Sequence, residues 1–142
     1  MNPFKRSLLL CLALCLLTAS ACAAAAPAAP RYVEIFRDET GVGSLDLSTI
    51  EEQQGFVSGW IKIIPRGSFT KFEGKQIDRV MLHSAADLSS LRRQTLETVF
   101  YAKDGSVLYE AARDFVPDSG EPVIPATTAE AIYKALTNAA FK

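Results

Sequence analysis

The chain has 142 residues, with 15 Lys and Arg against 16 Asp and Glu, so its net charge at neutral pH is −1. Lys5 and Arg6 are the only charges among the first 30 residues, which leaves the other 112 residues with a net charge of −3. A part of this length holds one hydrophobic core rather than two, and its acidic balance gives no electrostatic basis for nucleic-acid binding.

Residues 1–26 have the pattern of a secretory signal peptide. A basic start is followed by an apolar run over residues 7–17 and by small residues over 18–26. This three-part pattern is typical of a leader that is removed on export, and the apolar run is shorter than the roughly 20 residues that a transmembrane helix needs. We therefore predict a cleaved signal at 1–26, a short Ala/Pro linker at 27–30, and one domain at 31–142.

All three cysteines lie in the leader, so the domain that remains has no disulfide to form. Cys11 and Cys15 belong to the apolar run, whereas Cys22 leaves two processing routes open. We favour plain cleavage at one of the A-x-A patterns around it. In the alternative, Cys22 is the acylated residue of a lipoprotein, because the small residues Ala19-Ser20-Ala21 precede it. The protein would then be attached to the membrane, and residues 23–30 would be its tether.

The first half of the domain reads as strands. Residues 31–36 and 44–47 are short β-branched and aromatic runs, and we expect the segment 38–43 between them to form a turn in which Gly41 and Gly43 supply the backbone freedom. Residues 55–64 give the clearest strand, with apolar side chains on both faces, so we expect a central strand with Trp60 in the core.

The second half adds a loop, three strands and a helix. Residues 65–74 are predicted as a loop, and strands are predicted over 75–84, 91–102 and 106–111, the last two joined by an Asp-Gly turn. Residues 127–141 form the one amphipathic helix, which begins with the capping-box pattern Thr127…Glu130. The fold class expected is therefore α+β, an antiparallel sheet of about five to six strands with one C-terminal helix packed on it.

Catalytic and metal-binding patterns are missing from the mature sequence. His83 is the single histidine, no G-x-S-x-G motif is present, and only Asp78 and Asp87 are near His83 in the chain. We therefore predict a protein that is not an enzyme and that has no metal and no cofactor. His83 is interpreted as a structural or solvated strand residue.

Two features suggest binding to proteins. In the loop after residue 64, basic side chains alternate with aromatic ones, a composition that suits protein interfaces: Arg66, Phe69, Lys71, Phe72 and Lys75. The alternative, which we favour, is that both Phe residues fold back onto the core as a lid while the charges are solvated. Arg92 and Arg93 form a second basic spot, interpreted as a solvated strand face.

The chain ends in Lys142, so an ammonium group and a free carboxylate lie close together. Lysine-binding pockets of host kringle domains recognise this pair of charges. Plasminogen capture through Lys142 is therefore a hypothesis for this residue.

The order of these segments resembles the surface-adhesin protein E family of exported bacterial proteins. The family's features and their counterparts here are an aspartate-containing turn at 44–50, a Trp-centred strand at 57–62, an Asp followed by two Arg at Asp87 and Arg92-Arg93, a strand–turn–strand with Tyr101 and Gly105, and a Pro, a Thr cap and a short helix over 124–136. Leu88 stands where the family often has Cys, and no cysteine follows the helix.

The resemblance implies an antiparallel sheet with a C-terminal helix, homodimers in some members, and attachment to host extracellular-matrix proteins. Our leading hypothesis is a non-enzymatic, adhesin-like protein of a Gram-negative bacterium, located in the periplasm or on the outer-membrane surface. One alternative is a periplasmic structural or accessory module with no host ligand. Another is a small-molecule carrier with a pocket between sheet and helix.

Overall fold

The computed structural model describes residues 31–142. The predicted signal peptide, the linker and Cys22 lie outside the described residues, so their processing stays a prediction. Within residues 31–142, no helix is both long enough and apolar enough to cross a membrane.

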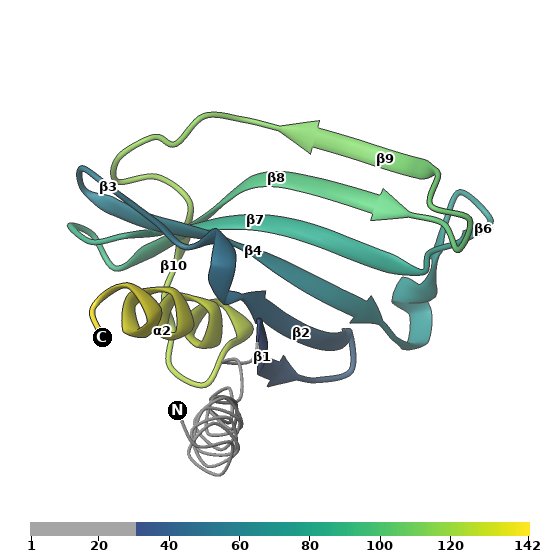
Figure 1. Ribbon diagram of the computed structural model, residues 1–142, viewed down its shortest axis with the longest axis horizontal. Helices are drawn as coiled ribbons and strands as arrows, with labels where there is room; N and C mark the ends of the chain where they lie inside the picture. The colour runs from purple at the N-terminus through teal and green to yellow at the C-terminus, as the bar shows by residue number, and fades with distance from the viewer. Residues whose placement is uncertain (1–30) are drawn as a thin grey trace, which may run out of the picture.

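The domain is built on one antiparallel sheet of eight strands (Figure 1). The central strands follow the order β1-β2-β4-β7-β8, with β3 on the edge of β4, and β9 and β10 both paired with β8. A two-stranded hairpin, β5–β6, stands apart from this sheet, and the helix α2 comes last. The bounds are β1 Tyr32–Arg37, β2 Gly41–Asp46, β3 Glu51–Gln53, β4 Phe56–Pro65, β5 Lys71–Phe72, β6 Lys75–Gln76, β7 Arg79–Asp87, β8 Arg92–Tyr101, β9 Val107–Ala112, β10 Glu121–Pro122 and α2 Thr128–Ala140.

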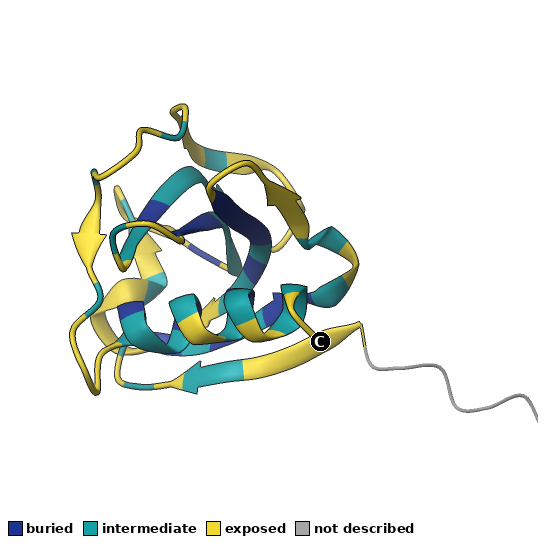
Figure 2. Ribbon diagram, turned by 90° about the vertical axis from the view of Figure 1, so that its left-hand side faces the viewer, coloured by how far each residue is buried: buried dark blue, intermediate teal, exposed yellow. Residues whose placement is uncertain are grey.

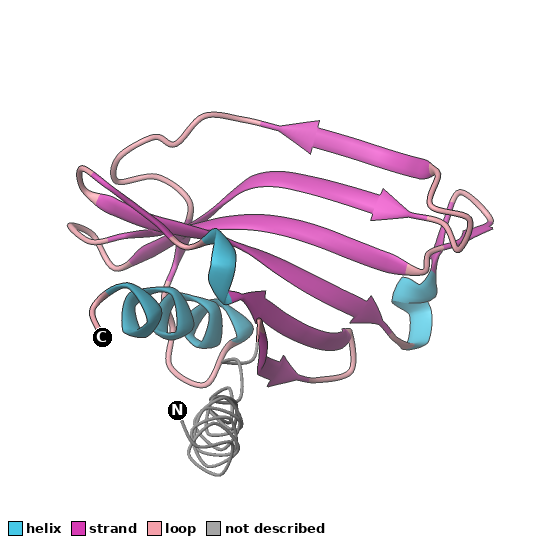
Figure 3. Cartoon of the chain, viewed as in Figure 1, coloured by secondary structure: helices cyan, strands magenta, loops and turns pink. Residues whose placement is uncertain are grey.

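The expected α+β class is confirmed, and the sheet has more strands than the five to six expected (Figure 3). The two additional strands, β3 and β10, are only three and two residues long. Residues 75–76, predicted to open a long strand, instead belong to β6, and β7 begins at Arg79.

The predicted turn at 38–43 is also wrong in extent, because Gly41 and Gly43 are strand residues of β2. Their partner strand β1 places the ring of Phe36 where a Cβ of Gly43 would lie. Gly43 is therefore needed for space rather than for turn geometry.

The hydrophobic core lies between α2 and one face of the sheet. The alternate residues Val57, Gly59 and Ile61 of β4 point to this face, and a Cβ at Gly59 would lie 3.0 Å from Leu136. The absence of a side chain at Gly59 lets the helix approach the sheet closely. Figure 2 shows the buried residues gathered in the central strands and on the sheet side of α2. The buried core consists of Leu45, Val57, Ile61, Ala86, Ile132 and Leu136.

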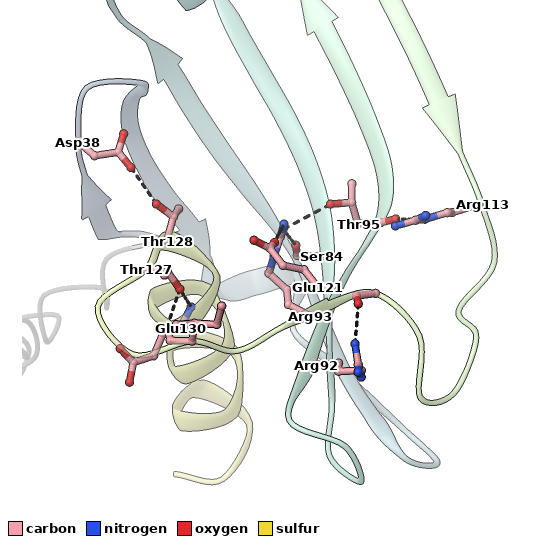
Figure 4. Close-up of polar contacts among 12 residues, drawn as sticks. Asp38, Ser84, Arg92, Arg93, Thr95, Arg113, Glu121, Thr127, Thr128 and Glu130 are labelled. Atoms are coloured by element: carbon pink, nitrogen blue, oxygen red, sulfur yellow. Dashed lines mark hydrogen bonds and ion pairs between the residues drawn. The ribbon is translucent and has the colours of Figure 1, made fainter.

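The helix begins as its sequence predicts. The Oγ1 of Thr127 accepts a hydrogen bond from the backbone N–H of Glu130 at 3.3 Å (Figure 4). The carboxylate of Glu130 accepts from the backbone N–H of Ala126 at 2.8 Å, one residue earlier than in the usual capping box. Both contacts satisfy amides near the start of α2.

Trp60 is not in the core, which corrects the sequence expectation. It lies on the sheet face opposite to α2, where it is half-buried and stacks on His83 with ring centroids 4.9 Å apart. Strand alternation explains the error: both faces of β4 carry apolar side chains, and the pattern does not tell which face the helix covers.

Two buried aspartates, each at the end of a strand, accept hydrogen bonds from the residues around them. Asp46, at the end of β2, accepts hydrogen bonds from Arg31 and Ser48, and the Arg31 guanidinium is the largest cause of its strongly lowered pKa. Asp87, at the end of β7, accepts from the backbone N–H groups of Ser89 and Asp118, both at 2.9 Å. Burial raises the pKa of Asp87, and hydrogen bonds from Ser89 and Asp118 outweigh it and bring the pKa to about 2.

Candidate binding surface

The sheet face opposite to α2, called here the open face, carries the side chains of the candidate site. Trp60 of β4 is paired with His83 of β7, and His83 is paired with Glu97 of β8. Directly paired residues point to the same face of a sheet, so these three side chains form a row across three strands.

The imidazole of His83 lies in the middle of this row. Burial is the largest influence on its pKa and lowers it, while the nearby carboxylates of Glu97 and Glu51 act in the opposite direction. The net result is a pKa below the ordinary value of 6.5, which favours the neutral form of the ring. It packs nearly parallel to Trp60, with 9° between the ring planes.

Two cation–aromatic pairs extend the open face toward its ends. The ammonium group of Lys62 lies 4.4 Å from the ring centre of Tyr32, and the guanidinium of Arg79 lies 4.4 Å from that of Tyr101. Lys62 and Arg79 share the face of Trp60 and His83 because they lie at even spacing along the same strands. The face thus combines aromatic rings with basic groups, which is the composition of many protein interfaces.

A groove of about 410 Å³ lies beside the row and is called here the open-face groove. Its walls come from β3, β4, β7, β8 and the segment that follows β9, and include Gln53, Ser58, His83, Glu97, Arg113 and Asp114. Phe115, from the same segment, stacks on Phe56 of β4 with ring centroids 4.0 Å apart. This stack holds the segment after β9 against β4 and so forms one wall of the groove.

Ser58 is the unusual residue of the groove. Its side chain is fully buried, and its Oγ has no hydrogen-bond partner within the described residues. Buried hydroxyls are nearly always paired, so an orphaned one in a groove wall points to a missing partner.

The predicted binding loop has a different structure from the one expected. Residues 67–70 form a 3-10 helix, and the β5–β6 hairpin follows. Phe72 folds back against Phe100 and Tyr109, with ring centroids 5.4 and 5.3 Å away, whereas Phe69 is 55% exposed. Phe72 therefore folds back onto strands β8 and β9, outside the core cluster, and Phe69 does not fold back. The basic residues Arg66, Lys71 and Lys75 are all exposed.

Arg92 and Arg93 are not a free basic spot. The guanidinium of Arg93 donates to the Oγ of Ser84 at 2.9 Å and to Glu121 of β10 at 2.8 Å, and that of Arg92 donates to the carbonyl of Gly120 at 3.0 Å (Figure 4). The side chain of Arg93 is only 14% exposed. Sequence reasoning missed this because it did not find β10.

Lys142 is exposed at the end of α2 and lines a small pocket of about 170 Å³ between the helix and the β1–β2 hairpin. The β5–β6 hairpin lies at the other end of the molecule's long axis (Figure 1). The structure therefore does not bring Lys142 and the loop residues into one site, and the open-face groove belongs to neither.

Sequence reasoning also missed the groove residues. Ser58, Glu97 and Arg113 are common residue types with no motif spacing, and they come together only through strand pairing. The one signal available was the second face of β4, where Ser58 and Trp60 lie side by side in alternation. In residues 31–142, no group of three or more His, Cys, Asp or Glu side chains is placed to hold a metal ion.

No family model matches the chain, and no curated protein is similar to it in sequence. Solved structures with a similar backbone course include two of protein E. Protein E of Haemophilus influenzae is 16% identical with a TM-score of 0.48, over 85% of this chain and 96% of that one. Protein E from non-typeable Haemophilus influenzae is 16% identical with a TM-score of 0.46, over 84% of this chain and 78% of that one. Membership of the protein E family stays a prediction from the sequence.

Proposed function

We propose that this protein is an exported, non-enzymatic, adhesin-like protein of a Gram-negative envelope that binds host extracellular-matrix proteins. The observation that carries this proposal is the open face. Helix α2 covers one side of the sheet, while the other presents the Trp60–His83 stack and the Lys62–Tyr32 and Arg79–Tyr101 pairs. Aromatic and Arg side chains are enriched where proteins bind proteins.

The secretory pattern of residues 1–26 supports export, and the resemblance to the protein E family supports matrix proteins as partners. The chemistry of the open face favours binding over catalysis. The imidazole of His83 is packed face-on against Trp60, which is an arrangement that presents a flat aromatic surface.

The segment from Arg66 to Lys75 supplies a second contact in this proposal. Phe72 anchors the hairpin on the sheet, while Phe69 and the basic side chains are free to touch a partner. Lys142 as a plasminogen contact and Cys22 as a lipid attachment site remain separate proposals for the same protein.

The carrier alternative has little support from the geometry. The pocket between α2 and the β1–β2 hairpin has a volume of about 170 Å³. Pockets that bury a small-molecule ligand are usually on the order of 300–1,000 Å³.

The periplasmic alternative differs from the adhesin proposal in location. Intact cells are treated with protease, and the mature protein and a periplasmic marker are followed by immunodetection. We expect the protein to be digested while the marker survives. Protection of the protein until the outer membrane is opened would replace the adhesin proposal with the periplasmic one.

A further inference from the structure

The open-face groove carries an excess of negative charge. Glu97 and Asp114 line it, and Glu51 lies at its border, because Glu51 of β3 is paired with Ser58 and points to the same face. Among the described residues that line the groove, Arg113 is the one cation. The three carboxylates and Arg113 together carry a net charge of −2 around the groove.

Arg113 does not neutralise these carboxylates through a hydrogen bond in the structure. Its Nε donates to the backbone carbonyl of Thr95 at 2.6 Å, which ties the guanidinium to β8 (Figure 4). The carboxylates of Glu97 and Asp114 are therefore available to another cation.

Ser58 gives an independent reason to expect a ligand. Its buried Oγ has no partner within residues 31–142, although it has one proton to donate and two lone pairs to accept with. A buried hydroxyl without a partner destabilises the protein, so the protein gains when a ligand supplies that partner. A ligand that donates hydrogen bonds and carries positive charge would satisfy both Ser58 and the carboxylates.

We propose that the open-face groove binds the side chain of a Lys or Arg residue presented by a peptide segment of a partner protein. Glu97, Asp114 and Glu51 attract the charge, and the Oγ of Ser58 accepts a hydrogen bond from the ammonium or guanidinium group. The groove's volume of about 410 Å³ admits such a side chain, and charge complementarity selects it over an acidic one. This inference rests on the proposed function in taking a protein as the partner.

The test is a titration of the purified mature protein with the blocked peptide acetyl-Gly-Lys-Gly-amide and with its Glu counterpart. Trp60 is the only tryptophan of the chain, and it stacks on a groove residue, so its fluorescence reports binding. We expect a saturable change with the Lys peptide that weakens as salt is raised, and none with the Glu peptide. Equal response to both peptides, or to neither, would overturn the proposal.

Free n-butylamine separates the two sources of an ammonium group. If the groove binds the side chain of a peptide, butylamine should bind more weakly than the Lys peptide. If butylamine binds as tightly, the groove is a site for small amines and the assignment to a protein partner is wrong.

Matched carboxylate variants test the charge. Glu97→Gln should weaken binding of the Lys peptide roughly tenfold, as expected for loss of one charged hydrogen-bond partner. Glu51→Gln should weaken it less. Glu52→Gln is the control, because Glu52 is paired with Val57 and points to the opposite face. A Glu52 effect as large as that of Glu97 would contradict a local site.

Ser58 and Ser84 form a second matched pair, since both are fully buried on neighbouring strands. Ser58→Ala should weaken peptide binding several-fold without lowering the midpoint of urea unfolding, because the hydroxyl has no partner to lose. Ser84→Ala should lower the midpoint of urea unfolding and leave peptide binding unchanged, because the Oγ of Ser84 accepts a hydrogen bond from Arg93. Unchanged binding in Ser58→Ala would contradict the role of this hydroxyl.

These measurements use purified protein and do not depend on where it lies in the cell. A periplasmic location with intact Lys-peptide binding would remove the adhesin proposal and leave the groove assignment in place. If the protein is exposed on the cell surface but does not bind the Lys peptide, the adhesin proposal stands and the groove assignment is removed.

Discussion

Trp60 and Ile61 are neighbours in β4 whose side chains lie on opposite faces of the sheet. Ile61 is fully buried in the core beneath α2, and Trp60 is half-buried on the open face, stacked on His83. Because side chains alternate between faces along a strand, Ile61 stabilises the fold while the adjacent Trp60 is free to contact a partner.

We expect Ile61→Ala to lower the free energy of unfolding by about 2–5 kcal/mol, because it leaves a cavity in a packed core. Trp60→Ala should lower it by less, about 1–2 kcal/mol, because part of the ring is already in contact with water. Urea unfolding followed by circular dichroism measures both. A loss in Trp60→Ala as large as in Ile61→Ala would return Trp60 to the core.

Individual residues also differ in whether their surroundings can be predicted from the sequence. The amphipathic C-terminal helix and its cap at Thr127 were predicted correctly, because their determinants lie within a few residues of each other. The surroundings of Trp60, Ser58 and Arg93 were not predictable, because their contacts come from strands far away in the chain.

At the scale of elements, Asp87 joins two turns. Its carboxylate accepts hydrogen bonds from Ser89, in the turn after β7, and from Asp118, in the segment that leads to β10. The hydroxyl of Tyr133 on α2 donates to the backbone carbonyl of Asp87 at 3.2 Å. One residue thus connects the sheet, the helix and the segment that walls the groove.

This connection makes stability depend on pH. The folded-state pKa of Asp87 is about 2, against an ordinary value of 3.8, so the carboxylate stabilises the fold above about pH 4, and this contribution is lost as the pH falls toward 2. A shift of this size corresponds to about 2 kcal/mol. We expect the wild-type protein to lose at least this much between pH 5 and pH 2, as measured by urea unfolding, because Asp46 adds to the loss.

The variant Asp87→Asn isolates the contribution, since an amide does not titrate in this range. Its unfolding free energy should fall less steeply with acid than that of the wild type. Asp78→Asn, at an exposed position just before β7, is the control. Equal slopes in wild type and Asp87→Asn would contradict the assigned role.

Elements differ in how far the sequence determines them. The six longer strands and α2 were found from local periodicity, with errors of a few residues at their ends. β3 and β10 were missed because each has two or three residues and exists only through pairing with β4 or β8. The β5–β6 hairpin was read as a loop and a strand start for the same reason.

At the scale of the whole molecule, helix α2 decides which face of the sheet is free. One helix covers one face, and the other is left with aromatic rings, paired cations and a groove. The groove was not predictable from the sequence, because it depends on the register of β4, β7 and β8. A β-bulge shifts that register between His83 and Ser84, and so sets which residue of β8 lies opposite His83.

The central claim is that the open face contacts partner proteins. The most direct test is binding of the purified mature protein to immobilised extracellular-matrix proteins, compared between Trp60→Ala and Lys134→Ala. Lys134 is an exposed residue of α2, on the other side of the sheet, and serves as the control. We predict that Trp60→Ala loses most of the binding while Lys134→Ala keeps it. Equal binding by both variants and the wild type would contradict the claim, and so would loss only in Lys134→Ala.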